Sequence, residues 1–198
     1  MTFDWFLSLL LFIFVAGFTP GPNNIIAMST GFNYGFRSVL PHVAGTTIGF
    51  PVMLLLIGFV LRPIMDQFEL FFMLLKYASV LYILYIAYHI ATAPTDGIDI
   101  DTKKKPITFL QSVAFQWINP KAWAGALATV TIYMPPNDYA NGLIVAAITS
   151  GTITLLALSS WALMGREINK FFSNSRQIMI FNVTMALLLI VSVMMMLF

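Results

Sequence analysis

The stretch Thr19-Pro20-Gly21-Pro22-Asn23-Asn24 lies inside an apolar segment, Trp5 to Thr30, that carries no charged residue. A proline has no backbone N–H and clashes with the preceding helical turn, and a glycine between two prolines adds a flexible residue. A continuous helix through this stretch is therefore not expected. The sequence predicts two half-helices separated by a break, and such a break leaves backbone N–H and C=O groups without helical partners.

The whole chain is apolar enough for a membrane. Hydrophobic residues make up 59% of its 198 residues and charged residues 9%, more apolar surface than a soluble domain of this size could bury. A hydrocarbon core about 30 Å thick needs about 20 helical residues, and lipid offers the backbone no other hydrogen-bond partner. The sequence predicts an all-α integral membrane protein, a single domain over residues 1–198 with six transmembrane helices. Their expected ranges are Trp5 to Thr30, Ser38 to Leu61, Leu70 to Thr95, Pro106 to Asn137, Tyr139 to Gly165 and Gln177 to Phe198.

Lysine and arginine are distributed unevenly over the loops between these spans. Loops of membrane proteins that are rich in these residues face the cytoplasm. We therefore expect the first, third and fifth loops to be cytoplasmic, including a linker over residues 93–106, and both termini to lie on the outer face. Seven basic residues lie on the predicted cytoplasmic side, against only Arg62 on the other: Arg37, Lys103, Lys104, Lys105, Arg166, Lys170 and Arg176.

The linker divides the chain into two sets of three spans, residues 1–92 and 107–198. Because three is odd, two homologous halves in tandem must have opposite orientations, which is the inverted-repeat arrangement of many secondary transporters. The fourth span is interrupted at Asn119-Pro120, at a depth that matches the break in the first span. Helices 1 and 4 are thus predicted to be broken, and such paired breaks are where these transporters bind substrate. The alternative for an isolated proline is a kink that neighbouring helices satisfy.

The predicted substrate-binding residues are those of the two breaks. Lys121 follows Asn119, which can cap a half-helix that begins at Pro120. A cation is misplaced at a helix N-terminus, and no acidic residue lies inside a predicted span, so a substrate carboxylate would suit Lys121. The alternative is that Lys121 extends to the outer interface. The freed carbonyls and the amide oxygens of the first break would accept hydrogen bonds from an α-ammonium group. The full set is Thr19, Pro20, Gly21, Pro22, Asn23, Asn24, Asn119, Pro120 and Lys121.

Small residues elsewhere indicate close helix contacts. Gly45 and Gly49 form a small-xxx-small pair in the second span, beside the hydroxyls of Thr46 and Thr47. Such pairs let helix backbones approach each other, so packing is the expected role. A similar cluster in the fifth span, residues 149–154, is expected to pack in the same way or to line a polar path.

Proton coupling would need a titratable group inside the membrane. The candidates are His42, His89, Lys76 and Lys121, and histidine is the side chain whose ordinary pKa lies nearest to neutral. Both histidines fall near the cytoplasmic ends of their spans, where exposure at the interface is the commoner explanation. Lys76 starts one turn inside the outer face and is expected to extend its amine to that interface.

Other classes of membrane protein remain alternatives: an ion or metal-ion transporter or channel, an intramembrane enzyme, and a structural subunit. A metal carrier would need carboxylates or histidine pairs at ligand spacing, and an intramembrane protease would need HExxH or a buried pair of aspartates. The predicted spans contain neither pattern. We expect no enzymatic activity, no cofactor, no bound metal and no nucleic-acid partner. Assembly into homo-oligomers stays open.

The stretch TPGPNNIIAMSTGFNYGFRSVLPHVAGTTIGF, Thr19 to Phe50, resembles the N-terminal signature of the LysE/RhtB amino-acid exporter family. The resemblance continues through YHIATAPT (88–95) and KPITFLQSVAFQWINPKAW (105–123), and is closest to the cysteine and O-acetylserine exporter branch. It implies a secondary active exporter of small neutral amino acids or derivatives, similar to cysteine, O-acetylserine or homoserine. It also implies the bacterial inner membrane as location, with the bilayer and a small amino acid as partners and the proton motive force as driving force.

Overall fold

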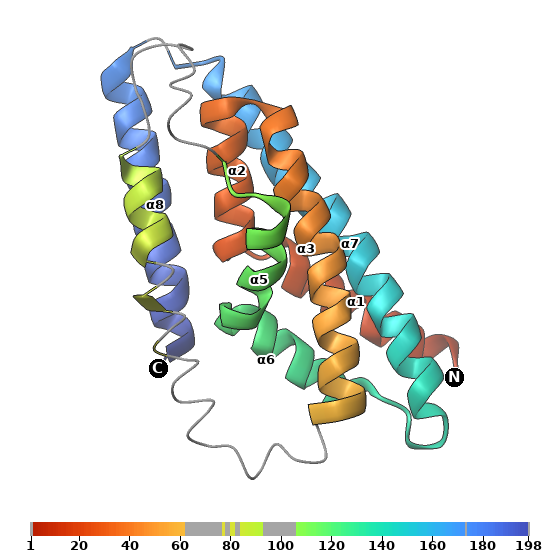
Figure 1. Cartoon of the computed structure of the whole chain (residues 1–198). Helices are drawn as coiled ribbons and strands as arrows, with labels where there is room; N and C mark the ends of the chain where they lie inside the picture. The colour runs from red at the N-terminus through yellow and green to blue at the C-terminus, as the bar shows by residue number, and fades with distance from the viewer. Residues whose placement is uncertain are drawn as a thin grey trace.

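The computed structural model describes residues 2–61, 77, 80–81, 84–92, 106–172 and 174–197. All of the regular elements in these ranges are helices (Figure 1). In chain order they are α1 (Phe3–Phe18), α2 (Pro22–Tyr34), α3 (Phe36–Leu56), the π-helix η1 (Ile57–Leu61), α5 (Phe109–Ile118), α6 (Pro120–Ala128), the π-helix η3 (Thr129–Tyr133), the short 3₁₀ helix η4 (Pro136–Asp138), α7 (Tyr139–Asn169) and α8 (Ser175–Leu197). Residues 84–91 are also helical.

Two continuous helical stretches in the described ranges are long and apolar enough to cross a membrane, Phe36–Val60 and Pro136–Asn169. They correspond to the second and fifth predicted spans. A third crossing results if α1 and α2 are counted together as one bent span. The third predicted span and the linker over residues 93–106 lie largely outside the described residues, as does Lys76. Six spans in two inverted repeats therefore stay a prediction, as does the single domain.

The predicted break in the first span is confirmed. Helix α1 ends at Phe18, α2 begins at Pro22, and the two axes bend by 49° at the break between them. Pro22 stands at the first position of α2, where its missing N–H would have had no helical partner in any case. The chemistry of two prolines around one glycine is thus sufficient to end one helix and begin another.

The predicted break in the fourth span is confirmed as well. Helix α5 ends at Ile118, and α6 begins at Pro120. The side-chain oxygen of Asn119 accepts a hydrogen bond from the backbone N–H of Lys121 at 3.0 Å, which is the cap expected from the sequence. The start of α5 is fixed in a similar way, because Thr108 and Gln111 form a reciprocal capping box.

Glycines set the close approach of α3 and α5. A Cβ added at Gly45 would lie 2.5 Å from the carbonyl oxygen of Phe109, and one at Gly49 would lie 3.0 Å from the Cα of Val113. The first distance is one that real Cβ atoms essentially never show, and the second is tighter than nine in ten real Cβ contacts. The small-xxx-small pair of the second span therefore packs two helices together, as predicted.

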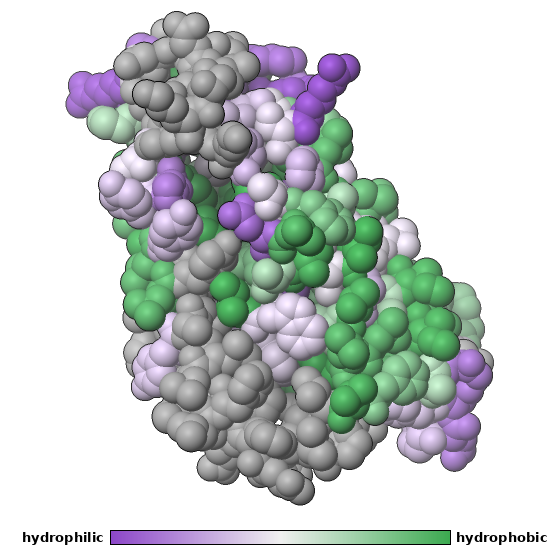
Figure 2. All heavy atoms as spheres, viewed as in Figure 1, coloured by the Kyte–Doolittle hydropathy of each residue, from purple (hydrophilic) through white to green (hydrophobic). Residues whose placement is uncertain are grey.

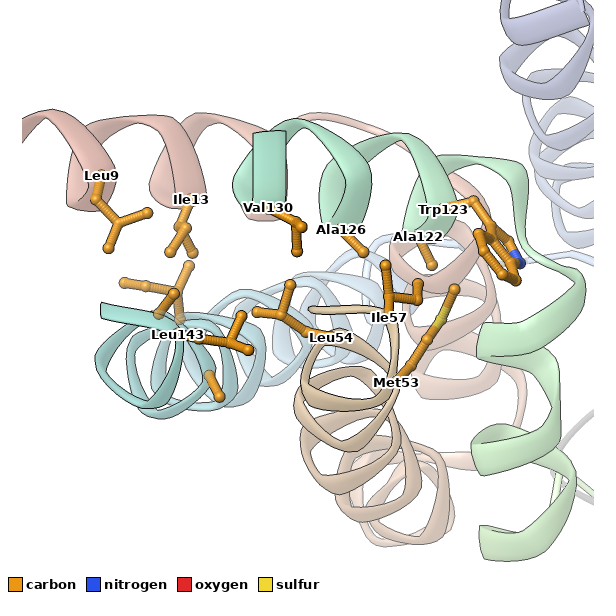
Figure 3. Close-up of a cluster of buried hydrophobic side chains, with 13 residues drawn as sticks. Leu9, Ile13, Met53, Leu54, Ile57, Ala122, Trp123, Ala126, Val130 and Leu143 are labelled. Atoms are coloured by element: carbon orange, nitrogen blue, oxygen red, sulfur yellow. The ribbon is translucent and has the colours of Figure 1, made fainter. Parts of the chain in front are cut away.

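A hydrophobic cluster joins α1, α3, α6, η3 and α7. In Figure 3, Leu9 and Ile13 of α1 point toward the side chains of α7 near Leu143, and Met53 and Ala126 lie further along the same cluster. All five of these residues are buried. This cluster packs the first half of the broken first span against the second half of the fourth, and so it positions the two breaks relative to each other.

The surface carries many exposed apolar side chains, including Leu11, Ile48 and Ile148. In the view of Figure 2, hydrophobic residues cover much of the described middle of the molecule, and the most hydrophilic residues gather mainly at its two ends. The start of α1 and the end of α8 lie toward one end of the bundle, and the α2–α3 turn lies at the other (Figure 1). This is the distribution of polarity that a bilayer selects.

Candidate functional site

A cavity of about 100 Å³ lies where the two breaks meet. One water needs roughly 10–15 Å³ of such space, so the cavity has room for several water-sized groups. Residues from α1, α2, α3, α5, α6 and α7 line it. Its polar lining residues are Asn23, Asn24, Thr46, Gln116, Asn119, Lys121, Thr129, Ser150 and Thr154.

Lys121 links the two breaks directly. Its Nζ donates a hydrogen bond to the carbonyl oxygen of Thr19 at 2.5 Å and lies 3.5 Å from that of Pro20. These carbonyls lack helical partners because the first span is broken there. The side chain is half-buried, and its amine reaches across to the first break. This contact favours a role at the breaks over the alternative that Lys121 extends to the outer interface.

Gly21 makes room for this contact. Its φ of −169° is extended backbone that any residue can adopt, so its conformation does not require glycine. A Cβ at this position would lie 2.6 Å from the Cδ of Lys121 and 2.8 Å from its Nζ. Any larger residue would therefore push the amine away from the break.

The carbonyls at the first break also accept hydrogen bonds from side chains other than Lys121. The side-chain amide of Asn24 donates to the carbonyl oxygens of Gly17 and Thr19, both at 2.8 Å. The indole N–H of Trp161 donates to the carbonyl oxygen of Phe18 at 3.3 Å. Asn24 thus holds the broken turn closed, a supporting role that differs from the ligand role expected for it.

Asn23 has a buried side-chain oxygen that accepts no hydrogen bond from the part of the chain that the structure describes. Its Nδ2 donates to Oε1 of Gln116 at 3.0 Å. Its Oδ1 is buried and has no hydrogen-bond partner among the described residues. A buried acceptor left unpaired costs about 1–3 kcal/mol, and Asn23 lines the cavity. A donor group placed in the cavity could satisfy this oxygen.

Gln116 is a site residue that was not among those predicted from the sequence. It is fully buried, and its Nε2 donates to the carbonyl oxygen of Ser112 at 2.7 Å and to Oγ1 of Thr46 at 3.4 Å. With the bond from Asn23, it ties α5 to α2 and α3 beside the cavity. The signal was present in the sequence, because an amide inside an apolar span is costly unless it has a function or a partner.

The two histidines lie in different surroundings. His42 is completely buried, so the expectation of interfacial exposure is wrong for it. His89 is exposed and lies against the rings of Tyr85 and Tyr88, in agreement with the expectation.

Most of the predicted site residues come together. Five of them line the cavity, and Thr19 and Pro20 present their carbonyls to Lys121. The remaining two, Pro22 and Pro120, begin α2 and α6 and so shape the breaks from outside the lining. The five lining residues are Gly21, Asn23, Asn24, Asn119 and Lys121.

A family model described as LysE type translocator matches residues 14–197. The chain belongs to the LysE type translocator family. Membership confirms the resemblance seen in the TPGPNN and NPK stretches, and with it a multi-pass bacterial membrane protein of the translocator class. A translocator function is also consistent with the expectation that the chain is not an enzyme.

Several curated relatives of this LysE type translocator share one protein name. The cysteine/O-acetylserine efflux proteins of Escherichia coli (strain K12) and Shigella flexneri serotype 5b (strain 8401) are each 34% identical to it over 183 residues. The protein of that name from Escherichia coli O1:K1 / APEC is 34% identical over 181 residues. In each case the match covers 89% of this chain and 89% of the relative. Among solved structures, none matches the chain.

Proposed function

We propose that this chain is a secondary active exporter of small neutral amino acids or their derivatives across the bacterial inner membrane, driven by the proton motive force. The observation that carries the proposal is the meeting of the two broken helices at one cavity. There, Lys121 of α6 contacts the carbonyls of the first break. Broken helices that meet inside a membrane protein are a recurrent way to bind small polar substrates. The names of the relatives support the substrate class.

The cavity offers one group for each charge of an amino acid. The Lys121 ammonium would bind the carboxylate, since a cation–carboxylate hydrogen bond is among the strongest that a protein forms. The unpaired Oδ1 of Asn23 would accept from the α-ammonium. In this arrangement the substrate carboxylate would share the Lys121 amine with the Thr19 carbonyl. All nine residues predicted from the sequence either contact the substrate here or shape the two breaks.

The rest of the lining favours a short, uncharged side chain. Aromatic and aliphatic residues supply the apolar part of the wall, and none of the described residues that line the cavity is acidic. A lysine-like substrate would therefore bring a second cation without a counter-charge. Cysteine, O-acetylserine and homoserine meet these limits. The apolar residues are Phe12, Ile13, Ala16, Phe50, Ala122, Ala157 and Leu158.

Transport by purified protein in proteoliposomes tests the function. We expect uptake of cysteine, O-acetylserine or homoserine against a gradient when the vesicle interior is acidic, and little uptake of lysine. Saturable lysine transport in preference to all three would contradict the proposed specificity. Ion flux without amino-acid transport would instead favour the alternative of an ion or metal-ion transporter or channel. The described residues hold no group of three or more His, Cys, Asp or Glu side chains that could bind a metal ion.

The proposed architecture is six spans in two inverted repeats, residues 1–92 and 107–198, with both termini periplasmic. Two observations support it: the two breaks meet, and the start of α1 and the end of α8 lie at the same end of the bundle (Figure 1). A topology reporter fused after Phe198 is expected to show that this end of the chain lies in the periplasm. A fusion after Gly35, in the α2–α3 turn, is the matched control and should report the cytoplasm. Cytoplasmic activity after Phe198 would overturn this topology.

A further inference from the structure

His42 lies in α3 next to the candidate site, and its ring lies between α2 and α5. Its Nε2 is 3.2 Å from the carbonyl oxygen of Asn23, and its Nδ1 is 2.9 Å from Oγ of Ser112. A carbonyl oxygen can only accept, so Nε2 carries a hydrogen and donates it to Asn23. Whether Nδ1 also carries one depends on Ser112, because a hydroxyl can either donate or accept.

The Ser112 hydroxyl has two acceptors within reach and a single hydrogen to give. Its Oγ lies 2.8 Å from the carbonyl oxygen of Thr108 and 2.9 Å from Nδ1 of His42. When His42 is neutral, the hydroxyl can donate to Nδ1. When His42 is protonated, Nδ1–H donates to Oγ and the hydroxyl donates to Thr108. Both protonation states are therefore fully hydrogen-bonded without any movement of the backbone.

In the described part of the chain, His42 forms no hydrogen bond or ion pair with another ionisable side chain. The elements packed against α3 are α2, α5, α6, α7 and η1. Of the ionisable groups on these elements, only Lys121 lines the cavity, and Arg166 pairs with Glu167 at the surface. Arg37, on α3 itself, is exposed. The ionisable side chains of these elements and of α3 are Tyr34, Arg37, Lys121, Tyr139, Arg166 and Glu167.

We propose that His42 carries the proton that this protein exchanges for its substrate, an inference that rests on the export function proposed above. The step places one proton on the Nδ1 lone pair and later releases it, and no other covalent bond changes. Histidine suits this role because Nδ1 can take up or release a proton while Nε2 keeps its hydrogen bond to Asn23.

Asn23 couples the proton to the substrate. Its backbone carbonyl accepts from His42, and its Oδ1 is the proposed acceptor for the α-ammonium. A positive charge on His42 would repel an α-ammonium held at the same residue, and such repulsion is strong in a protein interior. Proton and substrate therefore bind in turn. Mutually exclusive binding is what transport in opposite directions requires.

His42 also lies between an exposed part of the bundle and the cavity. Thr108 is exposed at the start of α5, and Ser112 lies one turn further along that helix. Asn23, on the other side of His42, lines the cavity. The imidazole thus lies between an exposed helix end and the substrate site.

The test compares two modes of transport in proteoliposomes with radiolabelled, reduced L-cysteine as the probe. One is exchange of internal for external cysteine, and the other is uptake driven by an acidic interior. For wild type, a gradient of about one pH unit should raise accumulation about tenfold if one proton moves per substrate. In His42→Gln the amide can still donate to Asn23 and accept from Ser112. We expect this variant to keep exchange and to lose the response to the gradient.

His89→Gln is the matched control, since it changes the other histidine of the chain at an exposed position. It should respond to the gradient as wild type does. Gradient-driven accumulation by His42→Gln would overturn the role of His42. If His42→Gln does not fold, Ser112→Ala leaves His42 in place, and an unchanged pH dependence of uptake in that variant would equally contradict the inference. Failure of wild type to exchange cysteine, O-acetylserine or homoserine would instead refute the proposed function.

Discussion

Replacement of Lys121 by methionine is expected to weaken substrate binding by about 30-fold or more. Removing one partner of a desolvated, hydrogen-bonded charge pair costs at least about 2 kcal/mol, and about 1.4 kcal/mol corresponds to a tenfold change in affinity. Methionine keeps much of the length of the side chain without its charge. The Thr19 carbonyl would lose the bond from Nζ at the same time, so the variant tests the contact that joins the two breaks.

Substrate analogues separate a binding role of Lys121 from a purely structural one. Cysteinamide lacks the carboxylate, so wild type should prefer cysteine to cysteinamide, and Lys121→Met should lose this preference. Lys121→Arg keeps the charge and should keep part of the preference for cysteine. In Gly21→Ala, the new Cβ would lie 2.6 Å from the Lys121 side chain. The affinity of this variant for cysteine should therefore fall, although the amine is still present. Unchanged affinity for cysteine in Lys121→Met would rule out the carboxylate role.

The two breaks could be predicted because their causes are local. Pro20 and Pro22 flank one glycine, and Pro120 follows an asparagine that can cap a helix. These residues impose their backbone preferences whatever the surrounding fold is. The boundaries at Phe18, Pro22 and Pro120 therefore follow from the sequence. The glycine pair at Gly45 and Gly49 was predictable for the same reason, since small residues in membrane helices commonly mark close contacts.

The partners across the site could not be predicted from the sequence. Lys121 contacts a carbonyl about a hundred positions earlier in the chain, and that pairing depends on how the helices pack. Asn23 and Asn24 both line the cavity, and the hydrogen bonds that each side-chain amide forms depend on the rotation of α2 about its axis. Adjacent positions on a helix point about 100° apart, so one asparagine closes the broken turn and the other presents an unpaired acceptor.

The burial of His42 has the same origin. Position along a span suggested exposure at the interface, but lateral position in the bundle decides exposure as much as depth does. His42 points toward α2 and α5, where it forms hydrogen bonds with Asn23 and Ser112. His89, at a comparable predicted depth in another span, is exposed. Sequence alone gives depth along a helix more readily than the direction in which a side chain points.

Replacement of Gly165 by valine is expected to prevent correct folding. Helices α2 and α7 cross so closely that a Cβ at Gly165 would overlap the carbonyl oxygen of Met28. At the reciprocal position, a Cβ at Gly31 would overlap the carbonyl oxygen of Ala162. Extra methyl groups in a packed core cost about 1–3 kcal/mol even where side chains can move aside. Here the obstacle is backbone, so the helices themselves must separate.

Thermal unfolding in detergent, with the yield of monodisperse protein, measures this effect. We expect Gly165→Val and Gly31→Val to give little or no folded protein, and the alanine variants to unfold at clearly lower temperature than wild type. Gly125→Ala is the matched control, because a Cβ there would meet only the ring of Phe50 at an ordinary 3.9 Å. A wild-type unfolding temperature for Gly165→Ala would contradict the close crossing of α2 and α7. Asn23 and Asn24 lie at the start of α2, one of the two helices that cross there. Loosening the crossing should therefore disturb the first break, although the substitution changes no residue of the cavity.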